Sequence, residues 1–359
     1  MEMINSQFWQ GKKVLLTGCT GFKGSWMTIW LNMLGAKVFG YSLAAPTNPS
    51  MWEDMQLEAL CAEMCYADIR DYARLESYLQ QVQPEIVIHM AAQPLVRYSY
   101  LHPRETYEVN VMGTVNLLDA IRNTGFGRAV VNVTTDKCYE NKEWLWAYRE
   151  NEPMGGHDPY SNSKGCSELV TSAFINSYFG HSDSQTFVAS GRAGNVIGGG
   201  DWAEDRLIPD IIRSFSKNEP VSIRFPNAVR PWQHVLEPLS GYLLLAEKLY
   251  NDKQYYVGGW NFGPLDSDTK TVAQIVDQMC AIWGDVASWS RDGNDNPHEA
   301  NLLRLDCSKA RMLLNWQPAW NSQITLTKLT LWYKAYFAGQ NMLELSQHQI
   351  NEYMKDTQC

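Results

Sequence analysis

A short apolar strand, a glycine turn and an apolar helix follow one another without interruption near the start of the chain. The strand is expected over residues 13–17, the turn has glycines at positions 18, 21 and 24, and the helix is expected over residues 25–34. Glycines in such a turn let the backbone bend tightly and approach a pyrophosphate, whose charge then lies at the positive helix N-terminus. The spacing G-x-x-G-x-x-G differs from the usual G-x-G-x-x-G, and a plain glycine-rich turn is the alternative. The feature therefore predicts a dinucleotide site only if other motifs agree.

Short apolar runs alternate with helical patterns through the first half of the chain. Further strands are expected over residues 36–42, 64–67, 85–90, 129–134 and 186–189, and a long helical segment over residues 103–122. Alternating β and α units with buried strands form a doubly wound parallel sheet, the Rossmann type of α/β fold, which binds its ligands at the carboxyl ends of the strands. From about residue 208 the pattern is irregular. We expect residues 1–200 to form a cofactor-binding domain and residues 201–359 a smaller α/β substrate-binding portion, with some later elements returning to the first domain.

Polar residues at the end of the expected fifth strand supply the chemistry. Thr135, Asp136 and Lys137 follow that strand, and Tyr160 and Lys164 come next along the chain. In a helix, a spacing of four places Tyr160 and Lys164 on one face, where an ammonium lowers the phenol pKa from its usual value of about 10. A phenol tuned in this way accepts an alcohol proton, and Thr135 can hydrogen-bond the same oxygen. The pattern predicts oxidation of a hydroxyl to a ketone by a nearby hydride acceptor, although Tyr-x-x-x-Lys also occurs often by chance.

Composition excludes several classes of protein. The net charge of −9 argues against a general binder of nucleic acid or of anionic membranes, because neutralising phosphates needs concentrated Lys and Arg. The first residues lack a basic and apolar leader, and no run of about 18 apolar residues occurs, so we expect a soluble cytoplasmic protein. The eight cysteines are scattered without C-x-x-C pairs, which favours reduced packing residues over a metal site or disulfides.

The sequence leaves the roles of several individual residues open. The expected second strand ends at Ser42 without the acidic residue that usually holds the adenosine ribose, which leaves NAD or NADP weakly specified. Asp68 either binds an adenine amino group or caps the next helix. His89 is expected in the core. Arg224, Arg230 and Arg304 are candidates for diphosphate binding, because a guanidinium matches phosphate oxygens in a bidentate fork, but each alone is more often a surface residue.

The motifs taken together resemble the extended short-chain dehydrogenase/reductase family over most of the chain. They are T-G-x-x-G-F-x-G at residues 17–24, Asp68, H-M-A-A at 89–92, N-V-x-G-T at 110–114, Y-x-x-x-K at 160–164 and R-x-x-N-V-x-G at 192–198. Within that family, Thr135 and Asp136 are similar to the nucleotide-sugar 4,6-dehydratases. Most of those enzymes have Glu at the position of Lys137 as base at sugar C5, whereas one branch has Lys, as this chain does.

The resemblance implies a cofactor, a substrate and roles for the residues. The cofactor is expected to be NAD rather than NADP, the substrate a nucleotide sugar, and the assembly a homodimer or homotetramer. Tyr160, Lys164 and Thr135 would act in oxidation at C4, Asp136 as acid at the C6 hydroxyl, and Lys137 as base at C5 or as a charged stabiliser. The expected cofactor contacts are Gly18, Thr20, Gly21, Phe22, Lys23, Gly24, Asp68, Ile69, Ala91, Ala92 and Gln93, with Tyr160 and Lys164. The expected substrate contacts are Asn195, Arg192, Arg230 and His298.

Two other functions share part of this pattern. A nucleotide-sugar 4-epimerase uses the same oxidation but needs no acid and base for elimination, so Asp136 and Lys137 favour the dehydratase. A catalytically inactive cofactor-binding sensor or scaffold would not need Thr135, Tyr160 and Lys164, all of which are present.

Overall fold

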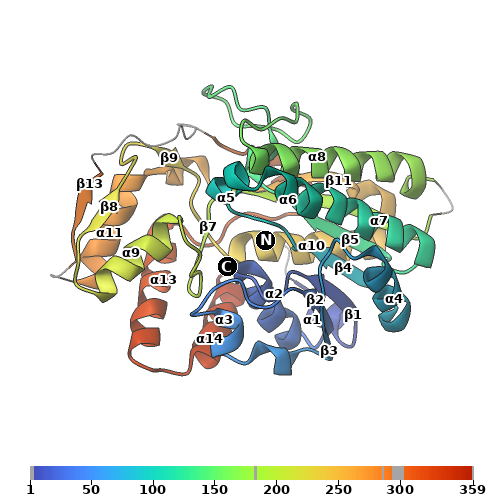
Figure 1. Ribbon diagram of the computed structural model, residues 1–359, viewed down its shortest axis with the longest axis horizontal. Coiled ribbons are helices and arrows are strands. Elements are labelled where there is room, and N and C mark those ends of the chain that lie inside the picture. The colour runs from blue at the N-terminus through green and yellow to red at the C-terminus, as the bar shows by residue number, and fades with distance from the viewer. Residues whose placement is uncertain (1–3, 182–183, 285–286, 293–302, 358–359) are drawn as a thin grey trace.

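Seven parallel strands form the central sheet of the protein, in the order β11-β6-β5-β4-β1-β2-β3. The computed structural model (Figure 1) describes residues 4–181, 184–284, 287–292 and 303–357. Strand β1 lies in the middle, paired with β2 on one side and β4 on the other, and the chain order reverses there. The predicted doubly wound parallel sheet is confirmed.

The first half of the chain supplies six strands of this sheet. Its elements are α1 (Ser6–Trp9), β1 (Lys13–Thr17), α2 (Phe22–Met33), β2 (Lys37–Ser42), α3 (Met51–Asp54), η1 (Leu57–Leu60), β3 (Glu63–Tyr66), α4 (Tyr72–Val82), β4 (Ile86–His89), α5 (Val96–Leu101), α6 (Pro103–Tyr107), η2 (Glu108–Met112), α7 (Gly113–Thr124), β5 (Ala129–Val133), η3 (Asp136–Cys138), α8 (Pro159–Phe174), η4 (Ile175–Phe179) and β6 (Phe187–Ala193).

The second half adds one strand to the sheet and builds a smaller portion beside it. Its elements are β7 (Val196–Ile197), α9 (Leu207–Ser216), β8 (Val221–Ile223), β9 (Val229–Arg230), β10 (Gln233–His234), α10 (Leu236–Asp252), η5 (Lys253–Tyr256), β11 (Gly258–Phe262), η6 (Asp266–Asp268), β12 (Lys270–Thr271), α11 (Val272–Trp283), β13 (Trp289–Arg291), α12 (Ser308–Leu313), α13 (Ser322–Phe337) and α14 (Met342–Asp356).

The sheet is buried on both faces because apolar side chains point alternately to either side of each strand. In β1, Val14 and Leu16 join one core cluster and Leu15 joins the other, and β4, β5 and β6 divide their residues in the same way. One cluster contains α4 and α7, and the other contains α2 and α10. In Figure 1 the helices α4 to α8 lie along one side of the sheet and α2 and α14 along the other.

The sixth strand and the long helix differ in detail from the sequence prediction. Strand β6 continues through Ala193, four residues beyond the predicted end at residue 189, and all of it is buried. The helix expected over residues 103–122 is present, but it has a π-helical turn at Glu108–Met112 between α6 and α7. Hydrophobic periodicity located both elements and could not define their ends.

The second portion lies at one end of the sheet, where α9, β8, β13, α11 and α13 group together in Figure 1. It contains two short strand pairs, β8 with β13 and β9 with β12. The chain returns to the main sheet with α10 and β11, which pairs in parallel with β6. In the described part of the chain, no helix combines the length and the apolar character needed to cross a membrane.

Candidate active site

A cavity of about 890 Å³ opens at the carboxyl ends of β1 to β6 and extends to the second portion. Its lining joins the glycine turn after β1, the ends of β2 and β3, the segment after β5, the start of α8 and residues 193–230. This is where a doubly wound sheet binds its ligands. The described residues contain no group of three His, Cys, Asp or Glu side chains that could hold a metal ion.

The glycine turn packs so closely that side chains are excluded from it. Gly18 has φ +71°, and a Cβ there would lie 2.6 Å from the backbone nitrogen of Ala91. A Cβ on Gly24 would lie 2.2 Å from the carbonyl oxygen of Gly18. Gly21 is the N-cap residue of α2 and has no side chain to cover the helix N-terminus, so the amide groups of that end face the cavity. A pyrophosphate fits such a turn in shape and in charge.

The residues predicted to contact the adenosine half of the cofactor lie together at the ends of β1, β2 and β3. Thr20, Asp68 and Ile69 line the cavity, and Thr20 hydrogen-bonds Ser42 at 2.8 Å. Asp68 accepts hydrogen bonds from Arg70, which hold the pKa of its carboxyl below the usual value. Helix α4 is capped by Asp71 instead, so the helix-cap interpretation of Asp68 is wrong.

Of the three residues after β4 that were predicted to contact the cofactor, two line the cavity and the third does not. Ala91 and Ala92 line the cavity. Gln93 does not: its side chain donates to Thr106 at 2.9 Å and accepts from the backbone of Leu95 at 2.5 Å. Its amide shapes the loop after β4, and its predicted contact with the cofactor stays a prediction.

Strand β5 delivers Thr135, Asp136 and Lys137 into the cavity. Thr135 is the N-cap residue of η3, and its hydroxyl oxygen accepts from the backbone of Lys137 and donates to Asp136 Oδ1 at 3.0 Å. Asp136 is 2% exposed, and burial raises its pKa against the opposing charge of Lys137 and the hydrogen bond of Thr135. The carboxyl occupies space left by Gly194, where a Cβ would lie 2.0 Å from Asp136 Oδ2. Asp136 is therefore a carboxyl group in a position that favours its protonated form.

Helix α8 carries Tyr160 and Lys164 on one face, as predicted. The helix begins at Pro159 and is capped by Asp158, which accepts from the backbone N–H of Ser161. Lys164 donates from Nζ to the carbonyl of Val133 at 3.1 Å, so its amine lies against the end of β5. Burial lowers the pKa of Lys164 to about 8. Both side chains line the cavity.

The electrostatics of Tyr160 differ from the sequence prediction. Burial raises the pKa of its phenol to about 12, while a hydrogen bond with Thr135 and the positive charge of Arg206 act in the opposite direction. The predicted lowering below 10 by Lys164 is wrong for the protein alone, because desolvation exceeds the effect of the neighbouring groups. The phenol is protonated in this environment near neutral pH.

Two cationic groups near Tyr160 had no predicted role in the chemistry. Lys23 comes from the glycine turn and lies 5.7 Å from the ring centre of Tyr242 on α10. Burial and the charges of Lys164 and Arg206 lower the pKa of Lys23 to about 7. Arg206 pairs with Asp201 at 3.0 Å. Arg206 comes close to Lys23 and Tyr160 because of the way residues 201–206 fold. No local sequence motif predicts this proximity.

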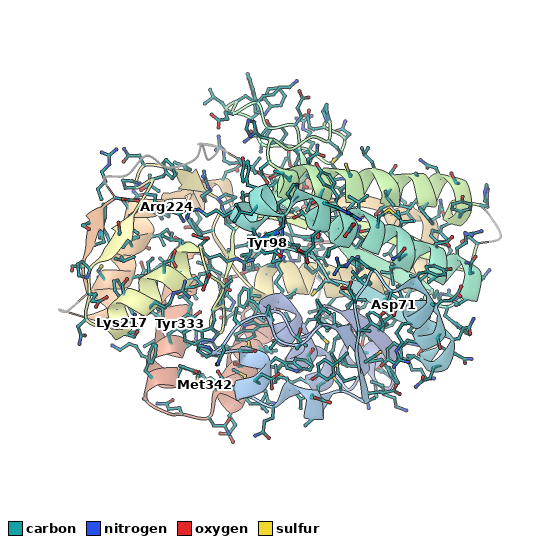
Figure 2. The ribbon with its side chains drawn as sticks, viewed as in Figure 1. Asp71, Tyr98, Lys217, Arg224, Tyr333 and Met342 are labelled. Atoms are coloured by element: carbon teal, nitrogen blue, oxygen red, sulfur yellow. The ribbon has the colours of Figure 1, made fainter. Side chains whose placement is uncertain are left out.

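The arginines proposed for the substrate occupy different places. Arg230 and Arg224 line the cavity with Asn195, and Figure 2 shows Arg224 in the second portion. Arg304 does not line it and donates to the carbonyl of Leu145 at 2.6 Å. His298 lies outside the described residues.

Arg192 is a correction to the predicted substrate site. It is 5% exposed and pairs with Glu168 at 2.9 Å through two nitrogens. It also donates to the hydroxyl of Tyr139 and the carbonyl of Glu150. These partners occupy its guanidinium inside the protein, so the prediction that Arg192 binds substrate is wrong.

His89 lies in the core, as predicted, and the segment between Tyr139 and Tyr160 borders the cavity. His89 is 3% exposed and hydrogen-bonds Thr17 at 2.7 Å within the core. The segment is largely irregular, and Asn141, Gly156 and other residues of it line the cavity.

Comparisons with known proteins agree with this geometry. The family model described as GDP-mannose 4,6 dehydratase matches residues 15–329. The CDP-glucose 4,6-dehydratase of Salmonella typhimurium is 57% identical over 358 residues, which are 99% of each chain.

Solved structures show the same fold at low identity. A UDP-glucose-4-epimerase from Stenotrophomonas maltophila with bound NAD superposes with a TM-score of 0.79 and 20% identity, covering 91% of this chain and 99% of that one. A dTDP-glucose 4,6-dehydratase from Bacillus anthracis in complex with NAD gives 0.74 and 19%, covering 93% and 100%. At these identities the two structures establish the fold alone.

Proposed function

The chain belongs to the GDP-mannose 4,6-dehydratase family, and we propose that it is an NAD-dependent hydro-lyase that converts CDP-glucose to CDP-4-keto-6-deoxyglucose and water. The observation that carries this function is the pair Asp136 and Lys137, which lies in one cavity with Tyr160 and Lys164. The 57% identity with a CDP-glucose 4,6-dehydratase over nearly the whole chain supports cytidine as the base of the substrate.

The first step oxidises C4 of the hexose. NAD held by the glycine turn would supply the hydride acceptor for C4 and the hydride donor for C6, so that no cofactor would be consumed. Tyr160 acts on the C4 hydroxyl as a phenolate, a form that Thr135 and the charge of Arg206 favour and that the positive charge of bound NAD would favour further. Lys164 is held beside them by the carbonyl of Val133.

The second step eliminates water from C5 and C6. The C4 ketone acidifies the proton at C5, which Lys137 removes. Asp136 donates a proton to the leaving C6 hydroxyl, a role that its burial favours because the neutral carboxylic acid is the form that burial stabilises. An acid and a base at adjacent positions suit an elimination across adjacent carbons.

The two portions of the chain divide the binding. Residues up to about 200 bind NAD through the glycine turn and the ends of β2 to β4. The later residues, with Asn195, Arg230 and Arg224, bind the nucleotide sugar, and the charge of the two arginines suits a diphosphate. That binding energy positions the hexose for reaction.

A nucleotide-sugar 4-epimerase is the second candidate, because a solved epimerase shares the fold. An epimerase has no use for a buried carboxylic acid beside Lys137, and this observation favours the dehydratase.

The product has a ketone at C4, which makes it a substrate for reduction, amination or further deoxygenation. We therefore place the protein in deoxysugar biosynthesis, such as that of the O-antigen of lipopolysaccharide, and expect a homodimer or homotetramer. Light scattering of the purified protein measures the number of subunits.

Mass spectrometry of the products tests the reaction. A panel of CDP-, dTDP-, GDP- and UDP-hexoses is incubated with the enzyme and NAD, and CDP-glucose is expected to lose one water fastest. A product of unchanged mass with inverted C4 would establish the epimerase instead.

The Asp136→Asn variant is expected to oxidise C4 and to stall before elimination, so that reduced nicotinamide accumulates. Asp119→Asn is the matched control, because Asp119 bonds Arg122 on α7 and does not line the cavity. If Asp136→Asn releases dehydrated product at the rate of the control, Asp136 is not the acid.

A further inference from the structure

The part of the cavity that lies in the second portion has mostly apolar walls. It is lined from α9 and from the segment that contains β8, and these two elements pack against each other (Figure 1). The apolar residues there include Ile208, Ile223, Phe225, Ala228 and Val272. An apolar pocket with an aromatic ring suits a flat nucleobase. Since the hexose has to reach Tyr160 and Asp136 at the edge of the sheet, the base of the substrate is left for this end.

One acid lies among these apolar residues. Asp210 comes from the first turn of α9, and in the described part of the chain no other Asp or Glu after residue 206 lines the cavity. Arg213 Nη2 donates to Asp210 Oδ1 at 2.5 Å. Arg213 also donates to the carbonyls of Trp202 and Ala203, so the guanidinium is fixed from a second side. Asp210 is therefore held in one orientation at the wall of the cavity.

The second oxygen of this carboxyl is available to a ligand. Within the residues that the structure describes, Asp210 Oδ2 has no hydrogen-bond partner. Burial raises the pKa of Asp210, and the hydrogen bond and charge of Arg213 act in the opposite direction. A guanidinium bonded directly to a carboxyl favours the ionised form, which can only accept hydrogen bonds.

A carboxylate in a cavity for a nucleoside diphosphate needs a reason, because it repels the phosphates. The pyrimidine bases supply one. Cytosine has an amino group at C4, which donates hydrogen bonds, whereas uracil and thymine have a carbonyl oxygen there, which accepts them. A carboxylate therefore binds the amino group of cytosine and disfavours the other two bases.

We propose that Asp210 selects cytosine by accepting a hydrogen bond from the amino group of the base at Oδ2, while Arg213 holds Oδ1. A diphosphate bound by Arg224 and Arg230 places the ribose and the base on the side away from the hexose, toward α9. The inference rests on the proposed function and adds to it the residue that determines the base. Neither Asp210 nor Arg213 takes part in the reaction at the hexose.

The relative affinities for CDP and UDP test this assignment. Both are measured by calorimetry on the protein loaded with NAD, and wild type is expected to bind CDP at least about tenfold more tightly. The amide of Asp210→Asn can accept from cytosine or donate to uracil, so this variant is expected to lose at least about tenfold of the preference. Asp119→Asn, on α7, is the control that keeps the wild-type ratio. A merely structural effect of the Asp210 substitution would weaken both nucleotides alike.

An analogue of the ligand gives a second measurement on the unaltered protein if Asp210→Asn does not fold. The diphosphate of 2-pyrimidinone riboside is CDP without the amino group, and wild type is expected to bind it at least about tenfold more weakly than CDP. Equal affinities for these two ligands, or the wild-type ratio of CDP to UDP in Asp210→Asn, would overturn the role of Asp210. If wild type binds UDP as well as CDP, the proposed base of the substrate is wrong as well. If it removes water from no nucleotide hexose, the proposed reaction is wrong.

Discussion

Glu168 on α8 connects the catalytic helix to two strands of the sheet, and its replacement by glutamine tests that connection. The carboxylate accepts from Arg192 Nε and Nη2, each at 2.9 Å, and from the hydroxyl of Thr134 at 2.5 Å. The side chains of Glu168 and Arg192 are only 5% and 6% exposed. Because Lys164 lies one turn before Glu168 and Thr134 directly precedes Thr135, the pair holds α8 against β5 and β6 where the site is built.

The expected cost follows from the burial of both charges. Glutamine keeps an oxygen acceptor but removes the negative charge, so Arg192 is left as a buried cation without its counter-ion. Breaking a buried pair in this way lowers the free energy of unfolding by about 3–5 kcal/mol. Because glutamine keeps some of the hydrogen bonds, we expect Glu168→Gln to lose about 3 kcal/mol, the lower end of this range. For a chain of 359 residues, that loss corresponds to about 4 °C in the melting temperature.

The change also reaches the active site. The negative charge of Glu168 raises the pKa of Lys164, which burial lowers to about 8. Without that charge, Lys164 loses its proton at lower pH. The alkaline limb of the pH–rate profile, where the ammonium is lost, is therefore expected to move toward lower pH in Glu168→Gln.

Thermal denaturation and a pH–rate profile measure both effects. Glu352→Gln is the matched control. Glu352 pairs with Lys328 at 2.7 Å, and because both side chains are partly exposed, this ion pair contributes less than about 1 kcal/mol to stability. Adding Arg192→Met to Glu168→Gln removes the unbalanced cation. The melting temperature of the double variant is therefore expected to fall by less than the sum of the decreases in the two single variants. Equal melting temperatures of Glu168→Gln and the control would refute the reasoning.

Three further substitutions test the chemistry and the stability separately. Tyr160→Phe is expected to abolish turnover while substrate affinity stays within a few fold, since the phenol acts in the transition state, and substantial remaining activity measured by product formation would exclude Tyr160 as the base. Lys137→Met is expected to slow exchange of the C5 proton of the product in deuterated buffer, and mass spectrometry showing exchange with an unchanged pH profile would remove Lys137 from the base role. Burial raises the pKa of Glu237 to about 7, so its contribution to stability is complete below about pH 4.5 and is lost as the pH rises through 7. The melting temperature of wild type is therefore expected to fall relative to Glu237→Gln between pH 5 and pH 8, and parallel curves would contradict this.

The sequence predicted those parts of the site that follow from local order. Thr135, Asp136 and Lys137 follow a strand, so they had to lie at the carboxyl edge of the sheet once that strand was recognised. Tyr160 and Lys164 share a helical face through their spacing of four. The glycine turn was recognised because a strand precedes it and a helix follows, and the packing of Gly18 against Ala91 explains the glycine there.

The errors occurred where a side chain depends on distant partners. Arg192 was predicted to contact substrate beyond a strand ending at residue 189, but it lies within β6, where alternate residues point to opposite faces. Its partner Glu168 is 24 residues earlier in the chain, and no local pattern links the two. The high pKa of Tyr160 has the same origin, since it depends on burial by segments that are distant in sequence.

The glycines at residues 191–199 show why this chemistry is built where the two halves of the chain meet. Each one leaves room for a side chain from elsewhere: a Cβ on Gly191 would meet Tyr242, one on Gly194 would meet Asp136, and one on Gly199 would meet Trp332. Tyr242 and Trp332 belong to the second half of the chain, so its folding closes the site around Asp136. An acid with a raised pKa needs such burial, and burial of a carboxyl beside a backbone requires a residue without a side chain. The glycine at position 194 therefore serves the reaction by giving Asp136 its buried position, and an alanine there would displace the acid, because its Cβ would lie 2.0 Å from Asp136 Oδ2.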